Sequence, residues 1–410
     1  MLNLGLEFEL IKINEICILN GFNYSKNEKW DFINYLDTKN INQGTINKFQ
    51  YFSIEEKIPS RAKRKVNNDD IIISTVRPNQ KHYGLIKDKP DNLLVSTGFT
   101  TLTINKEIAN PEFIYYYITQ PNITESLQII AEQSTTSYPS VKPSDIGNLI
   151  INIPTLNIQK KIGKFLSNFD KKIENLKNTN KKLDKILKEI FKNRFIRFEK
   201  YKKSNEMQIN DEFGEIPKNW SVEMLEDYVD FISGIEPGSK NYQENKCDDC
   251  IPFIRVGDLG SRDNMVYINK KFSKNKLLKS TDIVLSLDAT LGLVKIGLNG
   301  AYSTGMRKLV IKNNKINRVF LYCLVKSKRI QNTIENFATG TTILHAGKSI
   351  KHMNFVLPDE KTMIQFNKIG EPIFLKILEN KLEIDKLTKL RDILLPKLMS
   401  GEINVSNIKI

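Results

Sequence analysis

Short apolar runs bounded by turn-forming residues recur along this chain. They include Ile71 to Ile73, Leu102 to Ile104, Ile283 to Leu285 and Leu309 to Ile311, with Asp, Ser, Gly and Pro residues around them. Runs of this length with such boundaries are typical of buried strands. The pattern therefore predicts strands in two globular heads, each of mixed α/β fold.

The second half of the chain repeats the plan of the first. Short matching segments occur in the same order: Phe8-Glu9-Leu10 and Trp220-Ser221-Val222, Asn20-Gly21 and Ser233-Gly234, Asp70 to Ser74 and Asp282 to Ser286, Ser96 to Gly98 and Ser303 to Gly305, and Phe113 to Tyr115 and Phe320 to Tyr322. Each match is short, and their common order is what indicates an internal repeat.

A heptad pattern of apolar residues follows each head. The first consists of Ile162, Leu166, Phe169, Ile173, Leu176, Asn180, Leu183, Leu187 and Ile190. The second consists of Phe366, Gly370, Ile373, Ile377, Asn380, Ile384, Leu387, Arg391, Leu394 and Leu398. Spacings of four and three residues indicate long helices with an apolar seam. In the second pattern, Pro372 predicts a kink or a restart of the helix.

Each narrow apolar stripe needs a partner, and the two helices can cover each other. In a chain with two equivalent halves, a pseudo-twofold axis makes such helices antiparallel, and one register places Asn180 opposite Asn380. A buried polar pair of this kind fixes the register of a helical pair at some cost in stability. The alternative is that both asparagines reflect an Asn-rich composition.

These patterns divide the chain into five parts. A first head (1–153) and a second head (220–357) are each followed by a long helix, at 154–198 and 358–400, and a polar linker without periodicity occupies 199–219. The predicted fold class is α+β: two mixed α/β heads, joined by two long antiparallel helices, with a pseudo-twofold internal repeat.

The distribution of charged and apolar residues limits which partners and which location we expect for the protein. The net charge is +15, and residues 151–203 alone carry 16 Lys and Arg against 5 Asp and Glu. A solvated helix face and contact with DNA phosphates or an acidic partner explain this segment equally well. No apolar run approaches the ~18 residues of a membrane helix and no targeting segment is evident, so we expect a cytoplasmic protein.

The lone Cys247-x-x-Cys250 pair lacks a second closely spaced ligand pair. A zinc site normally requires one. We therefore expect a polar loop with reduced thiols and no metal.

Three segments resemble the specificity subunits of type I restriction-modification systems. These are Pro59 to Lys65 with Asp69 to Pro78, Gly214 to Trp220, and Leu390 to Ile403. The resemblance covers nearly the whole chain and implies two target recognition domains held apart by an antiparallel helical pair. It further implies a subunit that reads bipartite double-stranded DNA. Two modification subunits would methylate adenine with S-adenosylmethionine, and restriction subunits would use ATP and magnesium.

Motifs for catalysis by the chain itself are missing from the sequence. There is no GxxxxGK[ST] phosphate loop and no Asn/Asp-Pro-Pro-aromatic motif for a flipped base. We therefore expect no enzymatic activity and no bound cofactor. Two alternatives are a structural coiled-coil scaffold and a magnesium-dependent nuclease, because Asp359 with Glu379-Asn380-Lys381 superficially fits a PD…ExK pattern.

Base reading in the major groove favours Arg, Lys, Asn, Gln, Ser and Thr side chains. For each candidate, a solvated side chain or a phosphate contact is an equally good explanation. The candidates in the first head are Arg61, Lys63, Arg64, Lys65, Arg77, Thr135, Thr136 and Ser137, the last three within a polar run that ends at Tyr138. Those in the second are Arg255, Arg262, Arg307, Thr341 and Thr342.

Overall fold

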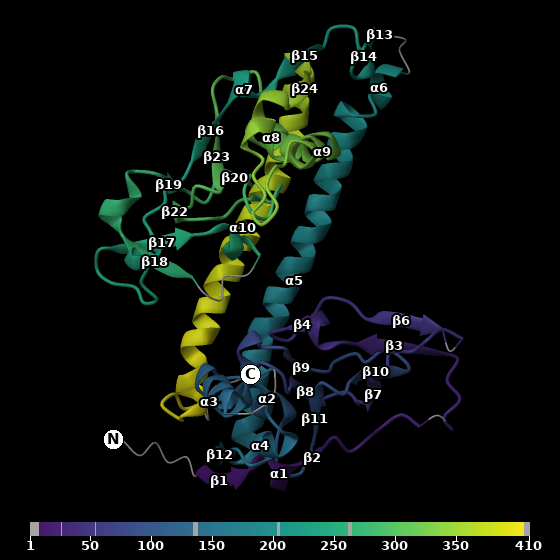
Figure 1. Ribbon diagram of the computed structural model, residues 1–410, viewed down its shortest axis with the longest axis vertical. Coiled ribbons are helices and arrows are strands. Elements are labelled where there is room, and N and C mark those ends of the chain that lie inside the picture. Colours follow the sequence, from purple (N-terminus) through teal and green to yellow (C-terminus); the bar gives the residue numbers. More distant parts are fainter. Residues whose placement is uncertain are drawn as a thin grey trace. The chain divides into compact units, whose positions relative to one another are not determined.

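The chain forms two compact units, which share the two long helices. The computed structural model describes residues 8–25, 27–53, 55–133, 138–202, 206–260 and 265–405. Unit 1 comprises Met1–Ile173 and Lys386–Ile410, and unit 2 comprises Glu174–Asp385. The long helices are α5 (Leu156–Phe195) and α10 (Glu360–Met399), and each contributes one part to either unit (Figure 1).

Unit 1 contains two four-stranded sheets, of order β6-β3-β10-β7 and β2-β11-β8-β9, and the pairs β1-β12 and β4-β5. Its strands are β1 (Phe8–Lys12), β2 (Cys17–Leu19), β3 (Phe32–Leu36), β4 (Ile41–Asn42), β5 (Thr45–Ile46), β6 (Gln50–Ser53), β7 (Ala62–Lys65), β8 (Ile71–Ser74), β9 (Tyr83–Leu85), β10 (Leu93–Ser96), β11 (Phe99–Ile104) and β12 (Ile150–Pro154). Its shorter helices are α1 (Ile13–Ile16), α2 (Pro111–Ile118), α3 (Pro121–Glu132) and α4 (Pro143–Gly147).

Unit 2 contains sheets of order β16-β23-β20-β21 and β18-β17-β22-β19, and the pairs β15-β24 and β13-β14. Its strands are β13 (Met207–Asn210), β14 (Gly214–Pro217), β15 (Ser221–Met224), β16 (Val229–Ser233), β17 (Cys250–Ile254), β18 (Val266–Asn269), β19 (Leu277–Leu278), β20 (Ile283–Ser286), β21 (Val294–Lys295), β22 (Gly300–Tyr302), β23 (Met306–Ile311) and β24 (Asn354–Leu357). Its shorter helices are α6 (Glu199–Lys202), α7 (Leu225–Tyr228), α8 (Arg318–Val325) and α9 (Lys328–Asn336).

The two heads have the same strand order. In the first head β10 pairs in parallel with β3, and in the second β22 pairs in parallel with β17. The central strands of the other sheet, β8 with β11 and β20 with β23, pair antiparallel in both heads. The predicted fold class is confirmed: two mixed α/β heads, two long antiparallel helices and an internal repeat.

The antiparallel seam of the long helices is visible within unit 2. The Asn380 side-chain amide donates to Asn180 Oδ1 at 2.8 Å, and the Asn180 amide donates to the Ile377 carbonyl at 3.2 Å. Asn380 is 2% exposed, so its polar group depends on this partner. The structure thus places Asn180 beside Asn380, and α10 continues through Pro372 without the predicted restart.

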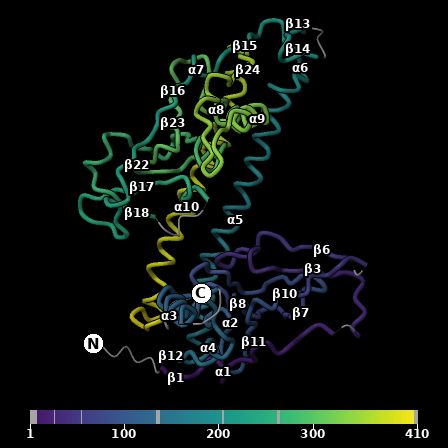
Figure 2. Tube along the Cα trace, viewed as in Figure 1, coloured from purple at the N-terminus to yellow at the C-terminus, as the bar shows by residue number. Residues whose placement is uncertain are grey.

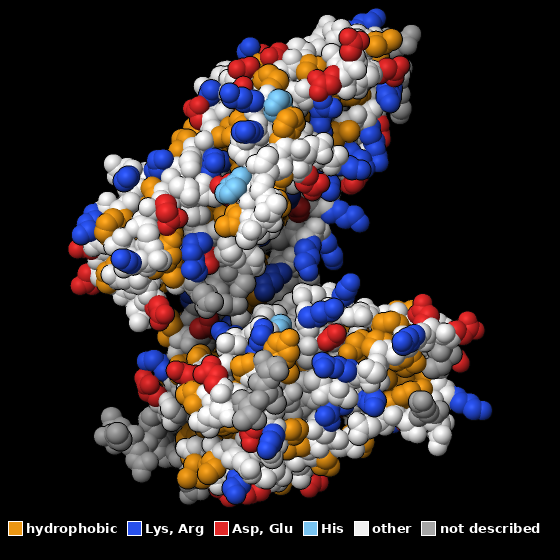
Figure 3. Space-filling view, viewed as in Figure 1, with side chains coloured by type: hydrophobic (Ala, Val, Ile, Leu, Met, Phe, Trp, Pro, Cys, Tyr) orange, Lys and Arg blue, Asp and Glu red, His pale blue; other side chains and the backbone are white. Residues whose placement is uncertain are grey.

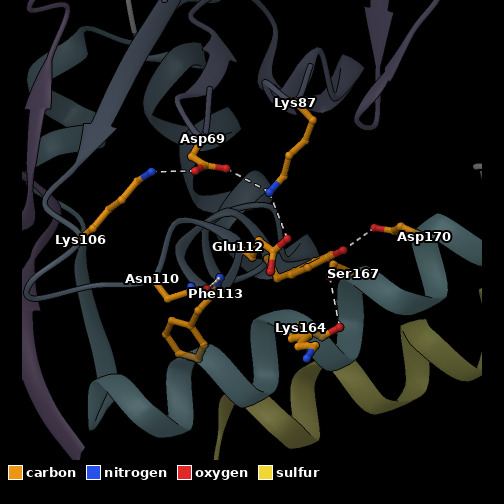
Figure 4. Close-up of polar contacts among 10 residues, drawn as sticks. Asp69, Lys87, Lys106, Asn110, Glu112, Phe113, Lys164, Ser167 and Asp170 are labelled. Atoms are coloured by element: carbon orange, nitrogen blue, oxygen red, sulfur yellow. Dashed lines mark hydrogen bonds and ion pairs between the residues drawn. The ribbon is translucent and has the colours of Figure 1, made fainter. Parts of the chain in front are cut away.

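Each head rests on a glycine of a long helix. A Cβ on Gly163 of α5 would lie 2.6 Å from Asn110 Oδ1 and 3.0 Å from the Phe113 nitrogen. A Cβ on Gly370 of α10 would lie 2.8 Å from Val319 Cγ1. Asn110 and Asn317 cap α2 and α8 by accepting from the backbone amides of Phe113 and Phe320 (Figure 4 for Asn110). The glycines therefore let the start of each head helix approach closely.

The C-terminal segment completes the core of unit 1. Leu398, Met399 and Val405 are buried together with Ile162 and Leu166 of α5 and the apolar residues of α2. Figure 2 shows the yellow end of the chain beside the blue trace of the first head. The core of the first head therefore includes residues from near both ends of the described chain.

The structure adds detail to one expectation and corrects another. The 199–219 linker contains α6 and the antiparallel hairpin β13-β14, whose Ile216 belongs to the core of unit 2. The expectation of reduced thiols is wrong for Cys247 and Cys250, which form a disulfide at the start of β17. Two residues lie between these cysteines along the chain, so either state was sterically possible.

Candidate nucleic-acid interface

Three loops of the first head meet at one end of the β2-β11-β8-β9 sheet. The Thr75 amide donates to the Gly98 carbonyl at 2.9 Å, which joins the loop after β8 to the turn before β11. The Arg77 amide donates to the Pro139 carbonyl at 2.9 Å, and the Val141 amide donates to the Thr75 carbonyl at 2.9 Å. We call residues 74–81, 96–98 and 138–141 the first loop cluster.

The second head has the same arrangement. The Leu287 amide donates to the Gly305 carbonyl at 3.0 Å, the Ala289 amide to the Leu344 carbonyl at 2.8 Å, and the Ala346 amide to the Leu287 carbonyl at 2.7 Å. We call residues 286–292, 303–305 and 339–346 the second loop cluster. The repeated Ser-Thr-Gly segments lie within the clusters, so the sequence repeat extends to their backbone hydrogen bonds.

Buried serines shape the loops that follow β8 and β20. Ser74 Oγ accepts from the Val76 amide at 3.2 Å and donates to the Val76 carbonyl at 3.1 Å. Ser286 Oγ accepts from the Leu293 amide at 2.9 Å and donates to the Thr290 carbonyl at 2.5 Å. Both serines are nearly fully buried. They satisfy backbone groups that the end of the strand leaves unpaired.

The structure brings part of the first head's predicted set to its loop cluster. Arg61 is exposed, and its carbonyl accepts from Thr97 of the cluster at 2.9 Å. Arg77 is an exposed member of the cluster. Both positions could therefore face a ligand at this end of the sheet.

The other predicted residues of this head differ in their surroundings. Lys63 is exposed, whereas Arg64 is half-buried and burial lowers the pKa of its guanidinium. Lys65 is ion-paired with Glu28 at 2.9 Å, and this hydrogen bond is the main cause that lowers the pKa of the Glu28 carboxyl. Thr135, Thr136 and Ser137 lie outside the described residues.

In the second head, two predicted arginines have partners within the fold. Arg255 Nε and Nη2 donate to the Asp258 carboxylate at 3.0 and 2.9 Å, which is the main cause of the raised pKa of Arg255. Arg307 Nη1 donates to the carbonyls of Thr304 and Met306. Its guanidinium therefore stabilises the backbone of the second loop cluster. Thr341 and Thr342 are exposed in the cluster, and Arg262 lies outside the described residues.

Sequence reasoning missed two features of the clusters. Arg77 and Ala289 occupy equivalent positions and both have left-handed backbones, with φ of 49° and 60°. Neither is a residue type that signals this conformation, so the sequence offered no clue. His345 Nδ1 lies 2.8 Å from Asp288 Oδ1 across the second cluster, and these residues are too far apart in sequence to suggest a pair.

The Lys and Arg side chains of the basic segment 151–203 are spread along α5. Figure 3 shows Lys and Arg side chains gathered along α5, while the drawn faces of both heads mix positive and negative side chains. Contact with phosphates and contact with an acidic partner both fit this distribution.

The nuclease alternative is contradicted by the positions of its carboxylates. Asp359 accepts from the Thr362 amide at 2.8 Å and from Trp220 Nε1 at 2.9 Å at the start of α10. Glu379 is further along the same continuous helix and is ion-paired with Lys376 at 2.8 Å. Twenty residues of helix span ~30 Å, so Asp359 and Glu379 cannot share a magnesium ion. Across the described ranges, no group of three or more His, Cys, Asp or Glu side chains could hold a metal.

Two heads whose four-stranded sheets have the same strand order and whose loop clusters are equivalent, carried on paired long helices, define a two-headed repeat protein. The family model described as "Type I restriction modification DNA specificity domain" matches residues 6–185 and 217–393. The chain therefore belongs to this family. In the part of the chain that the structure describes, no helix is long and apolar enough to cross a membrane.

Curated relatives cover nearly the whole chain. The specificity subunit of the type I restriction enzyme MjaIX from Methanocaldococcus jannaschii is 31% identical, over 87% of this chain and 83% of its own. That of HindI from Haemophilus influenzae is 26% identical, over 92% of this chain and 96% of its own. The crystal structure of a type I restriction-modification S subunit from M. genitalium has a TM-score of 0.58 at 19% identity, with 97% of each chain covered. This likeness supports the fold.

Proposed function

We propose that this chain is the DNA-reading specificity subunit of a type I restriction-modification complex, and that each head reads one half of a bipartite site. The observation that carries the proposal is the recurrence of the same loop cluster in two heads of one topology. Two copies of one reading surface in a single chain suit a target with two separate half-sites. The family membership supports the same role.

Catalysis and cofactors belong to partner subunits under this proposal. The only pair of carboxylates that suggested magnesium chemistry in the sequence is separated along α10. Two modification subunits would supply adenine methylation with S-adenosylmethionine, and restriction subunits would supply ATP- and magnesium-dependent cleavage. The contribution of this chain is to choose the DNA sequence on which they act.

The test is to exchange one head in the assembled complex. The chain is co-expressed with its modification subunits in a host without other adenine methylation, and methylated motifs are read by sequencing the host genome. Replacing residues 220–355 with the matching segment of a relative should change one half of the motif and leave the other intact. If the methylated motif stays unchanged after the exchange, the heads have a scaffold role and the proposal is refuted.

A further inference from the structure

We propose that the left-handed residue after β8 is a base-reading position and that Arg77 there recognises guanine in the half-site of the first head. This inference rests on the proposed function and assigns one residue within it. The equivalent position in the second head is Ala289.

The first support is the conformation of Arg77. A positive φ is unfavourable for a residue other than glycine, and such strain persists only where the surroundings impose it. Here the Arg77 amide is held by the Pro139 carbonyl, and its carbonyl accepts from the Gln80 amide at 2.9 Å. The same strain and the same amide contact recur at Ala289, where the side chain is different. The backbone therefore projects whichever side chain is present from a fixed point.

The second support is the state of the guanidinium. Its central carbon lies over the Tyr138 ring, 5.2 Å from the ring centroid. Among the described residues, it has no hydrogen-bond acceptor and no ion-pair partner. Arg307 and Arg255 in the second head differ, because both are occupied by acceptors of their own fold. Stacking on an aromatic ring orients the guanidinium plane while leaving its donors available.

The chemistry of the ligand follows from this geometry. An oriented guanidinium can donate two parallel hydrogen bonds to O6 and N7 of guanine in the major groove. A phosphate contact carries no sequence information. The fixed position instead carries arginine in one head and alanine in the other, as expected of a position that changes with the base read. Alanine can make apolar contact with the thymine methyl group.

The experiment uses the full complex of this chain with its modification subunits. Binding to DNA is measured by competition among duplexes that carry each of the four bases at each half-site position. The variant Arg77→Gly removes the side chain and relieves the backbone strain, because glycine adopts positive φ freely. Arg77→Gln keeps a side chain that prefers adenine. Lys12→Ala, at an exposed lysine of β1, removes one positive charge from the same head as a control.

We expect Arg77→Gly to lose about 5- to 150-fold discrimination for guanine at one position of the first half-site. All other positions should keep their preferences. Arg77→Gln should shift that position towards adenine, and Lys12→Ala should change none. Conversely, Ala289→Arg should create a guanine preference in the second half-site alone.

Three results would overturn the assignment. One is an unchanged preference at every position in both Arg77 variants. Another is an equal loss of affinity for all four bases, which would identify a phosphate contact. The third is a lower melting temperature of Arg77→Gly together with unchanged base preferences in Arg77→Gln, which would identify a structural role. Failure of the proposed function is distinct, because the wild-type complex would then show no bipartite motif at all.

Discussion

In the first head, the Tyr116 hydroxyl of α2 donates to Asp170 of α5, and Arg391 of α10 is paired with the same carboxylate at 2.6 Å (Figure 4 for Asp170). In the second head, the Tyr322 hydroxyl of α8 donates to Asp184 of α5, and Lys326 of α8 itself supplies the cation. A tyrosine and an aspartate thus hold each head helix to α5, but the positive charge comes from a different helix.

This difference shows which part of the docking is general and which is local. The glycine on the long helix and the asparagine cap of the head helix are steric and backbone features, and both units have them. The residue that supplies the cation differs between the units, and so does the helix that carries it. Burial opposes the charge of Arg391, but the carboxylates of Asp170 and Asp392 outweigh it and raise the pKa of Arg391. Unit 1 therefore depends on charges from both long helices.

The largest effect that separates the two units should come from alanine at the docking glycines. Gly163→Ala would press its Cβ against a backbone nitrogen and a capping oxygen that cannot move without uncapping α2. We expect a loss of about 2 kcal/mol in the stability of unit 1. At Gly370 the nearest atoms are the methyl groups of Val319 and Leu187. Alanine favours helix over glycine by ~1 kcal/mol at both positions, so we expect a smaller loss at Gly370 than at Gly163.

Denaturant unfolding combined with peptide-level hydrogen exchange would assign each loss to its unit. Gly257→Ala serves as the control, because a Cβ there meets nothing within 4 Å. A larger loss for Gly370→Ala than for Gly163→Ala would show that the two docking sites are not related as described.

A smaller effect should distinguish the polar pair in the seam from its apolar neighbours. Asn180→Leu would leave the buried Asn380 amide without its acceptor, which should cost about 1–2 kcal/mol. The double variant Asn180→Leu with Asn380→Leu should recover that stability, because an apolar pair suits the seam, while the register becomes less strictly fixed. Urea unfolding in a double-mutant cycle measures this coupling. As a control, Asn178→Leu, at an exposed position of α5, should change stability by less than ~0.5 kcal/mol. If the losses of the two single variants simply add in the double variant, Asn180 and Asn380 are not coupled.

The repeat, the long helices and the family could be predicted from the sequence. The reason is that helix periodicity and the order of motifs can be read directly from which residue types occur at which positions. The 199–219 hairpin could not, since its polar strands lack the alternation that marks a half-buried strand. Arg61 and Arg77 were candidates by residue type alone, and their place at one end of the sheet depends on how the loops meet. The internal bonding of Arg307 depends on where the Thr304 and Met306 carbonyls point. Such a detail is set by three-dimensional packing and leaves no trace in residue order.

The smallest expected effect concerns the starts of the long helices and their response to acid. Asp359 precedes α10, whereas the uncharged Thr155 precedes α5. Burial alone would raise the pKa of Asp359, but hydrogen bonds from Thr362, Trp220 and Tyr201 outweigh it and lower that pKa. A carboxyl whose pKa is lower in the folded state stabilises that state above its unfolded pKa, and this contribution is lost as the pH falls through the folded value.

We therefore expect Asp359→Asn to cost unit 2 about 1 kcal/mol at pH 7 and progressively less below about pH 4, the ordinary range of an aspartate. Thr155→Ala should show a difference from wild type that does not depend on pH, because no charge is lost. Thermal unfolding of both variants from pH 7 down to the acid limit of folding provides the measurement. A constant gap between wild type and Asp359→Asn over that range would mean that the charge of Asp359 contributes nothing beyond its hydrogen-bonding geometry.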